Sequence, residues 1–321
     1  MPRVHIVSLG GTIAMTGSSG HPGVVPRLDA HDLVAAVPGL PDVAQVSAES
    51  FLRVPGAHLR VEDILDLARH LSGIEADGVV VTQGTDTIEE TAFVLDLVAD
   101  LPVPVVMTGA MRNPELPGAD GPANLLAAVT VAADPGARGV LVVFDEQIHA
   151  ARYVEKTHTS RPDAFRSPSA GPLGEVTEGE VRWLWPAPPR VVVPDVATPI
   201  PRVPMLDTWL GDDGAVLEAV LSTRPDGLVL RAMGAGHVPL ALVEPLTSAA
   251  EQIPVALTSR TGSGRPYRRT YGFPGSETDL LSRGLIWGGG LAPHKLRLLL
   301  TLGLAAGWDR GQISAAISTL G

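Results

Sequence analysis

The sequence predicts an α/β protein: a larger N-terminal domain built on a mostly parallel sheet, followed by a smaller C-terminal α/β domain. Short β-branched runs alternate with helical patterns along the N-terminal half, as in chains that form a parallel sheet covered by helices on both faces. A proline-rich stretch follows, and beyond it comes a shorter series of strand and helix patterns. We therefore expect domains at 1–185 and 205–321 joined by a linker at 186–204.

Composition narrows the class of protein. The 321 residues are 45% hydrophobic and 18% charged, an ordinary globular balance with ample material for a buried core. The net charge of -11 argues against a nucleic-acid partner. The absence of cysteine excludes disulfides and thiolate metal ligands. No apolar run reaches membrane-spanning length and the start lacks a signal-peptide pattern, so we expect a soluble, cytoplasmic protein with no membrane partner.

The first predicted strand, 4–9, ends in Gly10 and Gly11, which let the backbone turn sharply and approach a ligand closely. The segment 15–27 is rich in Gly, Ser and Pro, and we interpret it as a mobile loop over this edge of the sheet. The pattern further predicts helices at 28–37, 61–71 and 124–133 and strands at 103–108 and 139–144.

The stretch 79–91 predicts a buried strand, a glycine turn and a helix, because β-branched residues lead through a polar loop into apolar residues at helical spacing. Thr87 and Glu90 fit a capping box at the helix start. The loop places Thr85 and Asp86 at the carboxyl end of a strand, where ligands bind in open α/β sheets. The alternative is that this pair merely caps the helix.

Beyond residue 144 the pattern changes. The segment 145–159 is polar and alternates towards its end, as an antiparallel ribbon does. In the smaller domain we expect strands at 227–231 and 254–259 and helices at 238–252 and 294–305, the last of which closes the domain.

Two threonines at neighbouring strand ends, Thr12 and Thr85, suggest nucleophilic catalysis. A hydroxyl becomes a good nucleophile only when a base takes its proton or a cation stabilises the alkoxide. Asp86 is adjacent, and Lys156 is the only lysine of the first domain. Lysine can lose its charge when desolvated, so a Thr–Lys–Asp set can relay a proton, and glycine-turn N–H groups can hold an oxyanion. A solvated surface position for Lys156 is the alternative.

Six sequence runs resemble the bacterial-type L-asparaginase/glutaminase family, and the likeness extends nearly end to end. They are LGGTIA at 9–14, VVVTQGTDTIEETAF at 79–93, VVMTGAMRNP at 105–114, IHAARYVEKTHTSRPDAF at 148–165, LTSRTGSG at 257–264 and GGLAPHKLRLLL at 289–300. The resemblance implies a flavodoxin-like N-terminal sheet, a smaller C-terminal α/β domain, and a homo-oligomer, either a dimer or a tetramer of close dimers. It implies hydrolysis of the side-chain amide of asparagine, and possibly of glutamine, through an acyl-threonine and without cofactor.

The resemblance also implies site residues. Thr12 matches the family's nucleophile, and Thr85, Lys156 and Asp86 match its proton relay. The family's aspartate also holds the substrate's α-amino group. The two glycines Gly11 and Gly84 flank these positions as substrate-binding residues. Separately, Glu277 falls where the family has an acid that reaches into a neighbouring subunit's site; an exposed loop acid is the alternative.

The chain departs from the family at the residues that bind the α-carboxylate and α-amino groups of the substrate. Gly56 and Ala57 stand where the family has a serine and a Gln or Glu that bind the substrate's α-carboxylate and amine, and His58 follows them. His237 replaces an asparagine, and Gln83 replaces a histidine found in many members. No tyrosine occurs at 15–27, where the family's lid has one; His21 could take over its task.

The two replacement histidines, His58 and His237, are candidate substrate ligands. Two histidines do not make a metal site, so we expect no metal. Three functions stay open: an asparaginase, an amidohydrolase of the same mechanism for a larger or modified Asn-type amide, and a non-catalytic binding protein of the same fold. A dinucleotide enzyme fits poorly, because Gly10 and Gly11 lack the G-x-G-x-x-G spacing.

Overall fold

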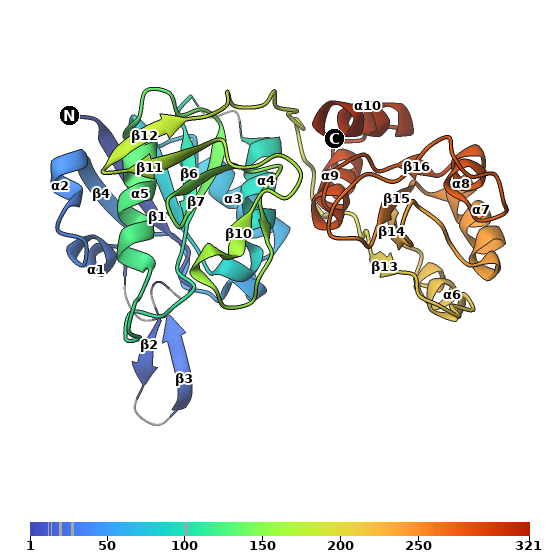
Figure 1. The fold of residues 1–321 in the computed structure, drawn as a ribbon, viewed down its shortest axis with the longest axis horizontal. Coiled ribbons are helices and arrows are strands. Elements are labelled where there is room, and N and C mark those ends of the chain that lie inside the picture. The colour runs from blue at the N-terminus through green and yellow to red at the C-terminus, as the bar shows by residue number, and fades with distance from the viewer. Residues whose placement is uncertain (12, 14, 19–20, 27–28, 100–101) are drawn as a thin grey trace. The chain divides into compact units, whose positions relative to one another are not determined.

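The computed structural model describes residues 1–11, 13, 15–18, 21–26, 29–99 and 102–321, with the backbone alone described at 15–18 and 21–26 (Figure 1). The chain divides into two compact units, Met1–Val192 and Val193–Gly321. The division falls inside the stretch 186–204, whose limits as a linker stay a prediction. Among the described residues no helix is both long and apolar enough to cross a membrane.

The N-terminal unit is built on one mixed sheet with the strand order β12-β11-β8-β7-β6-β5-β1-β4 (Figure 1). The strands β4, β1, β5, β6 and β7 run parallel to one another, and β8, β11 and β12 are added antiparallel. The bounds are β1 Arg3–Ser8, β4 Gln45–Ser50, β5 Gly78–Thr82, β6 Val105–Thr108, β7 Val140–Phe144, β8 Gln147–Ala150, β11 Gly174–Thr177 and β12 Glu180–Trp183. The predicted mostly parallel sheet is confirmed.

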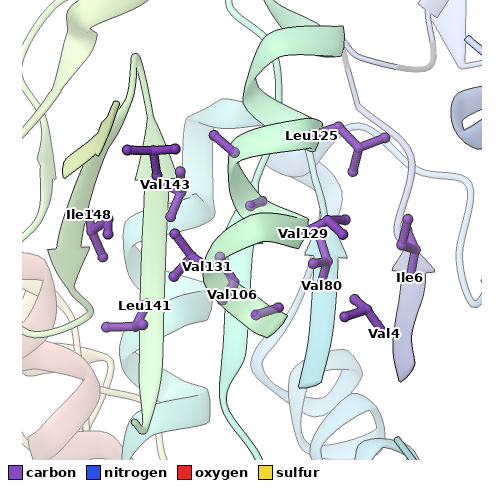
Figure 2. Packing of buried hydrophobic residues seen from close by; sticks show 14 of the residues in the cluster. Val4, Ile6, Val80, Val106, Leu125, Val129, Val131, Leu141, Val143 and Ile148 are labelled. Carbon is purple, nitrogen blue, oxygen red and sulfur yellow. The ribbon is translucent and has the colours of Figure 1, made fainter. Parts of the chain in front are cut away.

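Helices cover both faces of this sheet. They are α1 Ala30–Ala35, α2 Leu40–Val43, α3 Val61–Leu71, α4 Ile88–Val98 and α5 Gly121–Ala133. Leu125 and Val129 of α5 pack onto strand residues such as Val80 and Val106, in a core that α1 and α2 complete (Figure 2). The alternate residues, such as Val79, point to the opposite face of the sheet and are fully buried too. The helices α3 and α4 lie on that other side (Figure 1). Burial on both faces explains why these strands read as continuous apolar runs.

Several elements of this unit were not predicted, among them a hairpin and the edge strand β4. The loop expected at 15–27 contains an antiparallel hairpin, β2 Met15–Ser18 with β3 His21–Pro26, which projects from the end of the unit at which β1 finishes (Figure 1). Strand β4 was not predicted, because its sequence QVSAES is polar and lies half-exposed at the edge of the sheet. Pairing with β1, a tertiary contact, makes this segment a strand.

The ribbon expected at 145–159 is present as two short pairings. Strand β8 turns back antiparallel on β7, and β9 Glu155–Lys156 pairs antiparallel with β10 Phe165–Arg166. A 3-10 turn, η4 Pro162–Ala164, leads into β10. The segment thus contributes the return strand β8 after the last parallel strand, and its residues Glu155 and Lys156 lie on the separate short ribbon.

The C-terminal unit has a parallel sheet in the order β13-β14-β15-β16. Its elements are β13 Met205–Asp207, α6 Ala215–Ser222, β14 Leu228–Ala232, η5 Leu240–Leu242, α7 Val243–Gln252, β15 Val255–Ser259, α8 Glu277–Ser282, β16 Ile286–Trp287, α9 Pro293–Ala305 and α10 Arg310–Leu320. The expectation that α9 closes the domain is wrong, because α10 follows it. Asp309 and Gln312 begin α10 with a capping box.

Candidate functional site

The candidate site lies at the carboxyl edge of the N-terminal sheet. Backbone hydrogen bonds join the ends of neighbouring strands there: Leu9 N donates to Thr82 O at 2.8 Å, and Gln83 N donates to Thr108 O at 3.1 Å. The chain beyond β5 then forms a 3-10 turn, η3 Thr85–Thr87, before α4. This edge therefore brings loops that are distant in the sequence into one place, as the fold class predicts.

Three glycines from three loops meet at this edge. A Cβ atom added to Gly11 would lie 2.1 Å from Gly84 N, and one added to Gly56 would lie 2.7 Å from Gly84 O. A Cβ atom on Gly84 itself would lie 2.8 Å from Gly56 N. Because real Cβ atoms do not approach other atoms so closely, only glycine fits at each position. The three backbones thus form a contact that no side chain separates.

Lys156 lies beside the turn that carries Thr85 and Asp86. Its Nζ donates to Thr85 Oγ1 at 2.8 Å and to Asp86 Oδ1 at 2.8 Å. The Thr85 residue is 6% exposed and the Lys156 side chain 14%, whereas the Asp86 side chain is 68% exposed and faces solvent. The sequence-predicted relay residues are therefore in contact, and Lys156 is not a solvated surface lysine. Their catalytic roles stay a prediction.

Thr12, the predicted nucleophile, lies outside the described residues, as do the side chains at 15–18 and 21–26, including His21. The neighbouring residue Gly11 is buried, with φ at +90°, and abuts Gly84, the residue directly before Thr85. The backbone that leads to position 12 thus contacts the backbone that leads to Thr85.

Gln83 and Thr87 form a hydrogen-bond network that sequence reasoning missed. Gln83 Nε2 donates to Thr87 Oγ1 at 2.9 Å, and Thr87 Oγ1 donates to Gly56 O at 2.8 Å. Thr87 is the N-cap residue of α4, but its side chain caps no helical N–H, so the predicted capping box with Glu90 is wrong. The hydroxyl proton is committed to Gly56 instead. The signal in the sequence that could have indicated this network is Gln83 itself, a polar residue directly after a buried strand.

Gly56 is closely packed, and no open space lies beside it. Gly56 begins the 3-10 turn η2 Gly56–His58, and its contact with Gly84 fills the space beside it. Ala57 and His58, the next two residues, are exposed. The missing serine side chain is therefore replaced by close backbone packing and not by a void.

In the C-terminal unit, Glu277 is fully buried at the start of α8, so the exposed-acid interpretation is wrong. Its Oε1 accepts from Thr270 N at 2.8 Å and from Tyr271 N at 2.9 Å, and its Oε2 lies 3.2 Å from His237 Nε2. Burial raises the pKa of the Glu277 carboxyl, but the N–H donors of Tyr271 and Thr270 outweigh burial and hold that pKa below its ordinary value. Phe273 also contacts the His237 ring, at 5.0 Å between centroids.

Within the described ranges, no three His, Cys, Asp or Glu side chains are grouped as they would be around a metal ion. The chemistry that the described groups can perform is proton transfer. A lysine ammonium that bonds a threonine hydroxyl stabilises the alkoxide that forms when this hydroxyl loses its proton. The adjacent carboxylate fixes the position of the ammonium.

Known proteins share this architecture. Residues 3–189 match the family described as Asparaginase, N-terminal, and residues 202–317 match the Glutaminase/Asparaginase C-terminal domain. The chain is 39% identical to the Probable L-asparaginase of Deinococcus radiodurans over 98% of this chain and 96% of that protein. It is 33% identical to L-asparaginase 2 of Escherichia coli over 98% of this chain and 92% of that protein.

A solved structure is also similar. The crystal structure of a Probable Cytoplasmic L-asparaginase from Campylobacter jejuni is 31% identical, with a TM-score of 0.90, and the match covers 99% of this chain and 100% of the other. Sequence and fold comparisons thus agree over both units.

Proposed function

We propose a function for this chain from the premise that it belongs to the bacterial-type asparaginase family: it hydrolyses the side-chain amide of L-asparagine to L-aspartate and ammonia. The observation that carries the proposal is the bonding of Lys156 Nζ to both Thr85 Oγ1 and Asp86 Oδ1, each at 2.8 Å. A buried threonine hydroxyl bonded to a lysine is suited to relay protons to and from a nucleophilic hydroxyl.

The proposed mechanism has two steps and requires no cofactor. In the first, the Thr12 hydroxyl attacks the side-chain amide carbon, its proton passes to the departing nitrogen, and ammonia leaves an acyl-threonine ester. In the second, water attacks that ester carbon; one water proton returns to the Thr12 oxygen and the acid is released. Thr85, with Lys156, relays the protons.

The substrate's α-amino group is assigned to Asp86, whose exposed carboxylate is the accessible anion of the Thr85–Thr87 turn. The α-carboxylate then meets backbone and the exposed side chain of His58, because Gly56 supplies no hydroxyl. We therefore propose that His58 is a substrate-binding residue.

A companion proposal is that Glu277 with His237 completes the site of a neighbouring subunit. This proposal requires a homo-oligomer, either a dimer or a tetramer, and light scattering of the purified protein tests that requirement.

The decisive experiment is ammonia release measured with asparagine, glutamine and short Asn-containing peptides. Free L-asparagine is expected to be the best substrate, and Thr12→Ala is expected to abolish turnover while leaving L-aspartate binding measurable by calorimetry. Preference for a peptide-linked amide would favour the larger-substrate alternative, and binding without ammonia from any amide would favour the non-catalytic alternative.

A cytoplasmic location is also proposed, on the similarity to the Campylobacter jejuni protein. Fractionation of the native host tests this location.

A further inference from the structure

A chain of hydrogen bonds connects the end of the central strand to the Gly56 turn. Gln83, directly after β5, donates through Nε2 to Thr87 Oγ1 at 2.9 Å. Thr87 passes the connection to Gly56 O at 2.8 Å, across 31 sequence positions. Gln83 is fully buried and Thr87 is half-buried, so the Gln83 end of this chain of bonds is shielded from water.

The orientation of the Gln83 amide follows from this network. The Thr87 hydroxyl has one proton, which it donates to Gly56 O, so it can only accept from the Gln83 side. The second neighbour of Gln83 Nε2 is Gly84 O at 3.4 Å, which is also an acceptor. Both neighbours therefore require the NH₂ end of the amide, and the flipped amide would face them with an oxygen.

The other end of the same amide is left unsatisfied. Among all described residues, no donor reaches the buried Gln83 Oε1. Leaving a buried acceptor without a partner destabilises a fold. The glutamine is therefore poorly explained as a general stabilising residue and well explained by what its Nε2 holds in place.

Through Thr87, the Gln83 amide holds the backbone of the Gly56–His58 turn in place. Gly56 packs directly against Gly84, and the loop that follows Gly84 carries Thr85 and Asp86. We propose that Gln83 is a positioning residue for substrate binding: acting through Thr87, it fixes the Gly56–His58 turn against the loop of the proton relay. This inference rests on the proposed function, since it assigns the turn to the wall that receives the amino-acid end of the substrate.

The first test is a double-mutant cycle with variants that preserve volume. Gln83→Met and Thr87→Val are each expected to raise KM for L-asparagine about tenfold, the effect of one lost hydrogen bond, while kcat changes less than about threefold. Because both act through one chain, the double variant is expected to be no worse than either single variant. Thr87→Ser keeps the hydroxyl and is expected to retain the wild-type KM, in contrast to Thr87→Val. Additive losses, or a fall in kcat alone, would overturn the proposal.

The second test does not depend on activity. Amide hydrogen exchange of the segment 51–60 is expected to become faster in Gln83→Met and in Thr87→Val. Thr130→Val is the matched control, because the Thr130 hydroxyl donates to Leu126 O within α5, at 2.9 Å, away from the Gly56 turn. Exchange that is unchanged in both site variants would refute the positioning role. If the wild-type protein releases no ammonia from any amide, the proposed function fails, and this exchange measurement still decides whether Gln83 holds the turn.

Discussion

The ammonium of Lys156 lies 2.8 Å from the hydroxyl of Thr85, although the two residues are 71 positions apart in the sequence. The contact is fixed from behind: Lys156 pairs with Phe165 across the β9–β10 ribbon, and the buried ring of Phe165 stacks on Phe144 at the end of β7, with 4.2 Å between centroids. The ribbon that carries the lysine is thus anchored to the main sheet by an aromatic pair.

Replacing Lys156 is predicted to abolish turnover without unfolding the protein. Lys156→Met removes the cation beside Thr85, and a loss of about a thousandfold or more in kcat is expected for a group that acts as one unit with a nucleophile. Lys156→Arg is expected to fail as well, because a guanidinium cannot give up its proton. Ammonia release and circular dichroism check both points; wild-type rates in Lys156→Met would remove the lysine from the mechanism.

Gly11→Ala is predicted to damage the fold and the site together. The added Cβ would lie 2.1 Å from Gly84 N, and φ at Gly11 is +90°. Gly171→Ala is the control, because φ there is +76° and a Cβ would meet nothing within 4 Å. It isolates the backbone penalty of about 1 kcal/mol. Chemical denaturation is expected to show that Gly11→Ala costs about 3 kcal/mol. Equal losses in both variants would contradict the glycine contact.

The ionised Glu277 carboxylate is predicted to stabilise the fold in a pH-dependent way. Its pKa is lowered from the ordinary 4.5, so its stabilising effect is present above that value and is lost as pH falls through the lower folded pKa. Glu277→Gln removes the effect. The difference in unfolding free energy between wild type and variant is expected to be constant near neutral pH and to shrink below about pH 4.5. A difference that stays constant down to pH 3 or so would contradict this assignment.

Arg190→Met is predicted to destabilise the N-terminal unit. Arg190 Nε donates to Asp96 Oδ1 at 2.8 Å, and its Nη2 donates to the carbonyls of Asp96 and Ala99 at 2.6 Å, which caps the end of α4. Burial raises the pKa of Asp96 despite the attraction of Arg190, so removing the guanidinium leaves a poorly solvated carboxyl. A loss of about 3 kcal/mol in unfolding free energy is expected.

An exposed ion pair provides the comparison for that prediction. Arg182 Nη1 lies 3.0 Å from Glu175 Oε1, with the two side chains 72% and 40% exposed. Arg182→Met is therefore expected to cost less than about 1 kcal/mol, since solvent screens such pairs. Asp96→Asn added to Arg190→Met is expected to recover part of the loss. Equal costs for the two arginine variants would show that Arg190 contributes only as a surface residue.

Local patterns in the sequence predict much of the fold. The helix expected at 61–71 has those bounds in the structure, and the strands around 79–82, 105–108 and 140–144 lie where β-branched runs place them. Strand β4 was missed because it has no apolar signal of its own. The same limit applies to the capping box at Thr87, where a tertiary acceptor, Gly56 O, competes for the hydroxyl.

The fold class and the kinds of residue in the site could be predicted from the amino-acid sequence, because apolar periodicity and glycine turns are local properties of the chain. Three contacts became apparent only in the folded protein: Lys156 bonds Thr85, Gly84 packs against Gly11 and Gly56, and Glu277 is buried beside His237. Each of these contacts joins segments whose separation in space depends on the packing of the whole unit, so no local pattern of residues encodes it.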